Sequence, residues 1–358
     1  MINVPTLILD VEKCKFNIAA MAEKARKSNV IFRPHFKTHQ SHTIGNYFRE
    51  EGVTCITVSS LEMAHYFAVD NWKDITVAFP VNTLEIDSIN TLATGISLNM
   101  LVESTETLAN LSAKLTASIG VFIKIDIGFH RTGVAPENIE LITSILEEID
   151  NSEHITFRGF LGHAGHSYAA KSIDEVSAIH NESISIIVKI KEQFIDRYPD
   201  LIASVGDTPT CSLMNDFSIV DEIRPGNFVF YDLSQVSIGS CTVKQIAMAV
   251  ACPVVSIHKE RNEIIIYGGG VHLSKERIKH PKYGVIYGQV LGDDGVGWGD
   301  LLDKVYVSKL SQEHGTIRAP NEFIDSVAVG DLIKILPVHS CMTANLLKNY
   351  MTTDGQML

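Results

Sequence analysis

The sequence predicts a two-domain protein of mixed α/β and all-β class. A (β/α)8 barrel is expected over residues 10–238, and an antiparallel β domain over residues 239–358 together with residues 1–9. Apolar strand-like runs alternate with helical patterns eight times before residue 225, which is typical of a parallel barrel. After Asp232 the runs become β-type and are separated by Gly, Asp and Asn turns. The 358 residues accommodate both domains, because such a barrel typically occupies about 250 residues.

The elements of the barrel follow in order from the periodicity. Asp10 is expected to cap the first helix, whose apolar face consists of Phe16, Ile18, Met21, Ala22 and Ala25. Later helices are expected over 61–68, 105–115, 137–149 and 172–194. The eight strands are expected at 30–32, 54–58, 75–79, 97–102, 120–126, 155–161, 202–205 and about 219–224.

The second domain is expected to contain strands and no clear helix. The segment 5–9 is also strand-like and could pair with this domain. The expected strands lie at 245–255, 263–267, 284–291, 304–308 and 331–336.

The composition favours a small-molecule partner. Hydrophobic residues make up 45% of the chain and charged residues 20%, and the net charge of -12 argues against a nucleic-acid surface. No run of about 20 apolar residues predicts a membrane span, and no signal-like segment opens the sequence, so we expect a cytoplasmic protein. Six scattered cysteines predict buried thiols rather than disulfides.

The most informative residue is Lys37, in the sequence Arg-Pro-His-Phe-Lys-Thr-His-Gln (33–40), which follows the first barrel strand. Functional residues of such barrels gather at the C-terminal ends of the strands. With other cations nearby and little water, a lysine amine there can attack an aldehyde, and pyridoxal phosphate (PLP) is the aldehyde that enzymes most often provide. The octapeptide alone is equally consistent with a solvated basic loop.

The loops after strands seven and eight suit a phosphate group. Gly206 and Thr208 follow strand seven, and Gly226 and Asn227 follow strand eight. Phosphates in these barrels are usually held there by glycine-rich backbone N–H groups and hydroxyls. Either glycine alone could simply allow a tight turn, but both loops at the expected positions favour phosphate.

Polar residues after strands five and six are candidates for the ring of the cofactor. Arg131 could hold the phenolate oxygen of PLP, or could form an ordinary salt bridge with Asp126. His163 could lie against the ring face, and His166 and Tyr168 could donate to ring or substrate atoms. Each of these three could instead be a core residue.

A His-x-Cys pair, His339 and Cys341, closes a strand-like run. Residues i and i+2 of a strand face the same side, so both side chains could bind one metal ion. Imidazole with thiolate suits Zn²⁺, and two ligands leave positions open for water or substrate. By spacing alone, a chance pair is the more frequent explanation.

Five segments, taken in order, resemble the D-threonine aldolase and D-serine dehydratase family across nearly the whole chain. The resemblance implies an alanine-racemase architecture, with a PLP-binding barrel, a β domain and a metal near the cofactor, working as a head-to-tail homodimer. It further implies that Lys37 forms the Schiff base with PLP, Arg131 meets the ring oxygen and His163 packs on the ring. The matching segments are 33–39, 126–133, 206–210, 224–232 and 339–341. The other implied contacts are Tyr168 to the ring nitrogen and the loop 206–210, Gly226 and Asn227 to the phosphate.

The metal pair separates the branches of this family. The aldolases of this family tend to carry His-x-Asp, a ligand set suited to Mn²⁺ or Mg²⁺, and the dehydratases resemble this chain in carrying His-x-Cys. The resemblance therefore implies zinc-assisted loss of water from a D-3-hydroxy amino acid. Gln40 stands where relatives often have a basic residue, which leaves recognition of the substrate carboxylate open. The alternatives are retro-aldol cleavage to glycine and an aldehyde, a racemase, and a non-catalytic PLP carrier.

Overall fold

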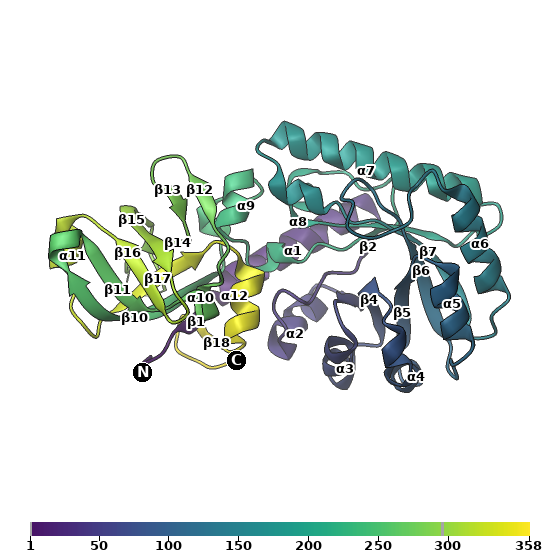
Figure 1. Cartoon of the computed structure of the whole chain (residues 1–358), viewed down its shortest axis with the longest axis horizontal. Coiled ribbons are helices and arrows are strands. Elements are labelled where there is room, and N and C mark those ends of the chain that lie inside the picture. The colour runs from purple at the N-terminus through teal and green to yellow at the C-terminus, as the bar shows by residue number, and fades with distance from the viewer. Residues whose placement is uncertain (1, 295–296) are drawn as a thin grey trace. The chain divides into compact units, whose positions relative to one another are not determined.

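The computed structural model describes residues 2–294 and 297–358, which fall into two compact units (Figure 1). The barrel unit comprises residues 19–37 and 44–226, and the β unit comprises the residues up to Ile18, residues 38–43 and residues 227–358. Helix α1 (Val11–Ser28) therefore contributes residues to both. Within the described residues, none of the helices combines the length and the apolar character that crossing a bilayer requires.

Eight parallel strands form the barrel, in the hydrogen-bonded order β2-β9-β8-β7-β6-β5-β4-β3. The backbone joins the two ends of this order, because Phe36 donates to the carbonyl of Thr57 at 2.8 Å and Thr57 donates to that of Pro34 at 2.9 Å. The predicted eight-stranded parallel barrel is confirmed. Its strands are β2 (Ile31–Phe32), β3 (Cys55–Val58), β4 (Asp74–Pro80), β5 (Ser97–Val102), β6 (Ile119–Lys124), β7 (Ile155–Leu161), β8 (Ile202–Val205) and β9 (Glu222–Ile223).

Helices alternate with these strands along the chain, as Figure 1 shows. Asp10 caps α1 as expected, since its carboxylate accepts from the Lys13 N–H at 3.0 Å, but Phe16 is 65% exposed and the prediction that it belongs to the apolar face is wrong. Phe16 lies two residues from the buried Cys14 and Ile18, which a helix places on nearly the opposite side. The other helices are α2 (His42–Glu50), α3 (Leu61–Val69), α4 (Ile86–Ala93), α5 (Thr105–Ser112), α6 (Ile139–Asp150), α7 (Ile173–Phe194) and α8 (Thr208–Leu213).

A buried ionic network anchors β2, the strand that precedes Lys37. The Arg33 side chain, 2% exposed, donates to Glu222 on β9 at 2.5 Å and to both carboxylate oxygens of Asp74 on β4 at 2.6 and 3.1 Å. A buried guanidinium with carboxylates on two other strands fixes the lateral position of β2, because leaving either charge unpaired would cost several kcal/mol, roughly 3–5.

The β unit is built on a second sheet of eight strands in the order β11-β16-β15-β14-β17-β10-β1-β18, with β11 also paired to β10. The N-terminal strand pairs antiparallel with β10 and parallel with β18, as its strand-like sequence suggested. The strands are β1 (Thr6–Leu9), β10 (Met248–His258), β11 (Glu263–Tyr267), β14 (Gly288–Leu291), β15 (Leu301–Leu310), β16 (His314–Arg318), β17 (Leu332–Pro337) and β18 (Tyr350–Thr352); β12 (Ile278–His280) and β13 (Gly284–Ile286) form a separate hairpin.

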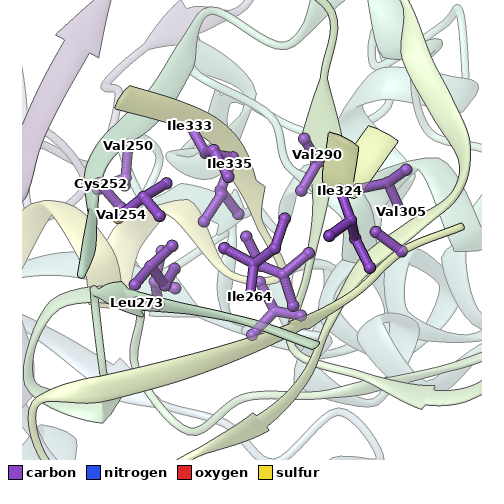
Figure 2. Packing of buried hydrophobic residues seen from close by; sticks show 14 residues of the cluster. Val250, Cys252, Val254, Ile264, Leu273, Val290, Val305, Ile324, Ile333 and Ile335 are labelled. Carbon is purple, nitrogen blue, oxygen red and sulfur yellow. The ribbon is translucent and has the colours of Figure 1, made fainter. Parts of the chain in front are cut away.

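The core of this unit consists of branched aliphatic side chains from several strands (Figure 2). Ile264 and Ile335 are fully buried, and the Cys252 thiol is buried beside them as a small apolar group. Gly288 allows close packing, since a Cβ there would lie 2.7 Å from a methyl of Ile335. All six cysteines are free thiols in the part of the chain that is described; four are buried as predicted, whereas Cys241 and Cys341 are half-buried.

The expectation that the second domain lacks helices is wrong. It contains α9 (Leu233–Ile238), α10 (Gly270–Leu273), α11 (Asn321–Asp325) and α12 (Ser340–Leu347). The last of these changes the geometry predicted for the metal pair: β17 ends at Pro337, His339 is the N-cap of α12, and Cys341 lies in its first turn. The segment after Ser340 is rich in Met, Ala and Leu, which favour a helix over a strand.

Candidate active site

Lys37 is held by its neighbours at the end of the segment that follows β2. Phe36 and Thr38 on either side are fully buried, whereas Lys37 itself is exposed. Buried anchors on both sides fix the backbone and direct the lysine side chain away from the core. The structure therefore places an accessible primary amine where the barrel strands end, which is the position that the sequence predicted for it.

Two histidines near Lys37 are held neutral. The Nδ1 atom of His163 lies 2.7 Å from the carbonyl oxygen of Gly206, and because a carbonyl only accepts, Nδ1 carries the proton and Nε2 is unprotonated. Burial lowers the pKa of His163 to about 3, and the cation of Lys37 adds to this effect. Burial, with Lys37 and Arg224 nearby, also holds the pKa of His35 well below its ordinary value. An uncharged imidazole at His163 is suited to packing on an aromatic ring.

The loop after β8 has the features of a phosphate cradle. A Cβ on Gly206 would lie 2.5 Å from the backbone nitrogen of Arg224, so only glycine fits where the β8 and β9 loops meet. The Thr208 hydroxyl is buried and has no hydrogen-bond partner among the described residues. Because a buried polar atom without a partner is costly, this hydroxyl fits an anion that a bound cofactor would supply.

Tyr168 comes from the segment after β7 and contacts this loop. Its hydroxyl accepts from the Thr208 N–H at 3.1 Å, so that the backbone of the predicted phosphate loop and the Tyr168 side chain contact each other. Asp207 fixes the conformation of this loop, because its carboxylate accepts from the Ser167 hydroxyl and from the N–H and hydroxyl of Thr210 at 2.7–2.9 Å. His163, Tyr168, Gly206 and Thr208 are thus brought together within the barrel unit.

Arg131 lies over the ring of Phe129 at 4.8 Å, and that ring is 6.1 Å from the ring of His163. The alternative of a salt bridge between Arg131 and Asp126 is wrong, since the Asp126 carboxylate contacts His130 Nδ1 at 2.9 Å and accepts from the His130 and Gly128 N–H groups. The guanidinium is therefore held by the face of an aromatic ring near the candidate ring-binding histidine.

The side chain of Asn227 is engaged in the β unit. Its Nδ2 lies 2.7 Å from Asp232, 2.9 Å from the Ser340 hydroxyl and 3.4 Å from the sulfur of Cys341. A contact from this residue to a phosphate would therefore come from its backbone rather than from its amide. Gly226, which precedes it, is half-buried at the end of the barrel unit.

His339 and Cys341 lie at the start of α12, where Thr38 and Asp232 contact them. The Thr38 hydroxyl lies 3.3 Å from the sulfur of Cys341, and His339 Nδ1 lies 3.2 Å from the carboxylate of Asp232. Burial disfavours the charged imidazole, but Cys341 and Asp232 outweigh burial and raise the pKa of His339 to about 9. Among the described residues, His, Cys, Asp and Glu form no group of three or more that could hold a metal ion.

Sequence reasoning missed two residues beside the predicted ones. Lys124 ends β6 fully inside the barrel, and burial together with Arg224 lowers its pKa to about 7; a lysine within the apolar run 119–125 was the available signal. Asp232 is fully buried beside the candidate metal ligands His339 and Cys341. Although it lies in a segment that resembles the family, nothing in its sequence context distinguishes a helix cap from a metal-site residue.

Two protein-family models match most of the chain. Residues 9–234 match the family model described as "Alanine racemase, N-terminal domain", and residues 247–353 match "Putative serine dehydratase domain". The chain therefore belongs to the alanine racemase N-terminal domain family, in the branch of D-serine dehydratases and D-threonine aldolases.

Particular relatives span the whole chain. A "D-serine dehydratase" of Dictyostelium discoideum is 29% identical, with 100% of this chain and 95% of that protein covered. A "D-threo-3-hydroxyaspartate dehydratase" of Delftia sp. (strain HT23) is 26% identical, covering 99% and 96%. A solved D-threo-3-hydroxyaspartate dehydratase, a cysteine-to-alanine mutant in the metal-free form, superposes with a TM-score of 0.93 at 26% identity, covering 100% and 97%.

Proposed function

We propose that this protein is a PLP- and metal-dependent lyase that removes water from a D-3-hydroxy amino acid, giving a 2-keto acid and ammonia. The observation that carries the proposal is the His339–Cys341 pair, whose sulfur contacts Thr38, the residue that follows Lys37 in the chain. A thiolate with an imidazole is a ligand set for Zn²⁺ rather than for Mn²⁺ or Mg²⁺. The named dehydratase relatives support the same reaction class.

The barrel residues would hold the cofactor. PLP, when bound, supplies an electron sink for the charge left by removal of the α-proton. Lys37 would bind PLP covalently and, once released as a free amine, would take that proton. Thr208 and the backbone at Gly206 would bind the phosphate, the neutral His163 would pack on the ring, and Arg131 would meet the ring oxygen. Tyr168 orients the phosphate loop through Thr208.

The metal pair would assist departure of the β-hydroxyl. His339 and Cys341 would hold the ion, which supplies Lewis-acid chemistry when bound. Thr38 and Asn227, both within 3.4 Å of the Cys341 sulfur, would stabilise its thiolate form by hydrogen bonding. A hydroxide is a poor leaving group, so the reaction needs this assistance at neutral pH.

The reaction is tested by measuring its products separately. Holoenzyme incubated with D-serine, D-threonine or D-3-hydroxyaspartate should release keto acid and ammonia in equal amounts. Glycine and an aldehyde without ammonia would replace the dehydratase assignment with retro-aldol cleavage, and a D-to-L interconversion without any of these products would indicate a racemase. The three substrates also define which side chain the site accepts.

Thr208→Val should have opposite effects on cofactor binding and on folding. Valine has nearly the same shape but lacks the hydroxyl, and a hydrogen bond to a charged group is worth about 1.5–3 kcal/mol, so PLP should bind roughly 10–100-fold more weakly. The apoprotein should melt at the same or a higher temperature, because the lost hydroxyl has no partner among the described residues. PLP titration and thermal melting measure the two effects. Thr143→Val on α6 is a control that should leave PLP affinity unchanged.

We further propose that the chain works as a homodimer. The alanine-racemase-like architecture supports this proposal, and exposed apolar side chains on the barrel unit, such as Leu84 at 92% and Phe79 at 60%, could take part in the interface. Light scattering on the eluting holoenzyme should give twice the mass of the 39.5 kDa chain, and a mass of one chain at micromolar concentration would refute the dimer.

A cytoplasmic location is part of the same proposal. The support is the set of free cysteines in the described part of the chain, since disulfides are rare in reducing compartments. Fractionation of cells that express the tagged protein should recover it with cytosolic markers; recovery in the membrane fraction would contradict this location.

A further inference from the structure

Asp232 is a fully buried carboxylate beside the candidate metal ligands. One oxygen, Oδ1, accepts from the Gln235 N–H at 2.9 Å and caps helix α9. The other, Oδ2, is surrounded by donors from Asn227 at 2.7 Å, from the Ser340 N–H at 2.9 Å and from the imidazole of His339 at 3.2 Å. The Ser340 hydroxyl lies at 3.3 Å from the same atom.

This arrangement determines the tautomer of His339. A carboxylate that receives several N–H donors is an acceptor only, so the Nδ1 atom of His339 must carry its proton and donate it. Nε2 is then the ring nitrogen whose proton a metal ion would displace, because Nδ1 keeps its proton for Asp232. In metal sites, a histidine that donates one N–H to a carboxylate is oriented by it, and its second nitrogen becomes a better ligand.

The same oxygen also reaches Cys341 through one intermediate residue. Asn227 contacts Asp232 Oδ2 at 2.7 Å and the sulfur of Cys341 at 3.4 Å with the same amide nitrogen. Asn227 is itself buried, and its amide oxygen has no partner among the described residues, so the orientation of the amide is set by its nitrogen contacts. One carboxylate oxygen thus aligns both members of the metal pair.

We propose that Asp232 is a positioning residue for the metal: it holds His339 with Nε2 free to coordinate and, through Asn227, holds the Cys341 sulfur. This inference rests on the proposed function, because it requires that His339 and Cys341 bind a metal ion. Helix capping by Oδ1 is a second role of the same side chain, and a test must separate the two.

Asp232→Asn separates them, because asparagine caps helices about as well as aspartate. With its oxygen on Gln235, the new NH2 group would face the donors of Asn227, His339 and Ser340. Zinc should bind the variant holoenzyme roughly 10–100-fold more weakly than wild type, the effect typical of losing such a partner. Competition with a chromophoric chelator measures the zinc affinity. The yellow cofactor colour should persist, and saturating zinc should restore most of the lost activity.

Asp207→Asn is the matched control. Asp207 is also a buried aspartate at a helix N-cap, on α8 of the barrel unit, and no metal ligand contacts its side chain among the described residues. Its substitution should leave the zinc affinity unchanged. Asp232→Ser, which keeps a capping oxygen and removes the second one, should show the same loss of zinc affinity and covers the case in which Asp232→Asn fails to fold.

The possible failures are distinguishable. If wild-type holoenzyme binds zinc and a folded Asp232 variant binds it within about twofold as tightly, Asp232 is only a helix cap and this inference is overturned while the proposed function stands. If wild-type holoenzyme binds no zinc, the metal assignment of the proposed function is overturned and this inference with it.

Discussion

Lys37→Ala will yield a protein without the yellow colour of lysine-bound PLP and with almost no lyase activity. The residue has two roles in the proposed function, covalent attachment of the cofactor and removal of the α-proton. Loss of a general base alone typically costs 10²–10⁴-fold in rate, so the decrease in kcat should be at least about that large. Absorbance of the purified protein after incubation with PLP, together with the keto-acid assay, measures both effects.

Lys37→Arg is the matched variant, because it keeps the positive charge but an always-protonated guanidinium cannot form the covalent bond. It should behave like Lys37→Ala. Reduction of the wild-type holoenzyme with borohydride followed by peptide mapping should find the cofactor on Lys37. If the colour survives in both variants, the covalent lysine is another one, and Lys124, whose pKa is lowered to about 7 by burial and Arg224, would be the first to map.

Removal of the metal by a chelator will abolish dehydration without releasing PLP. Lewis-acid assistance by a bound metal is worth several kcal/mol, which corresponds to a fall of about 10²–10³-fold in rate. The cofactor colour should remain, since no metal ligand belongs to the predicted phosphate or ring contacts. Ammonia release before and after dialysis against the chelator, and again after addition of Zn²⁺, is the measurement.

Variants of His339 and Cys341 are the controls for the chelator experiment. His339→Ala should show the same low activity with or without chelator, and added Zn²⁺ should not restore it. Cys341→Asp should recover activity better with Mn²⁺ than with Zn²⁺, because a carboxylate is a harder ligand than a thiolate. Full turnover of wild-type protein in the presence of an effective chelator would remove the metal from the mechanism.

Much of the fold could be predicted because its signals are local. The strands 97–102, 155–161 and 202–205 coincide with β5, β7 and β8, since each is a short run rich in apolar and β-branched residues and bounded by turn residues. The short helices α2 and α4 were not predicted, whereas α3 and α5, which are equally short, were. Serine side chains cap both α3 and α5, but α4 has no side-chain cap to mark its start. Phe16 is exposed on a helix that is otherwise amphipathic, and only packing decides such a position.

The places of the candidate residues along the barrel could be predicted, but the geometry around them could not. Lys37, Thr208 and His163 stand at strand ends, where the barrel fold requires functional groups to gather. By contrast, His339 and Cys341 were expected on one face of a strand, whereas the structure places them at the N-cap and first turn of α12. Asp232 could not be recognised at all, because its role depends on contacts with residues 107 and 108 positions later in the chain.

The buried Thr208 hydroxyl, which has no hydrogen-bond partner among the described residues, affects the stability of the folded chain as well as cofactor binding. Because this buried hydroxyl has no protein partner among the described residues, a bound phosphate group would stabilise the folded chain, and PLP would shift the folding equilibrium toward it. The supply of PLP would then affect the amount of this protein in a cell as well as the fraction of it that is active. A chain made during cofactor starvation would be the one most exposed to proteases.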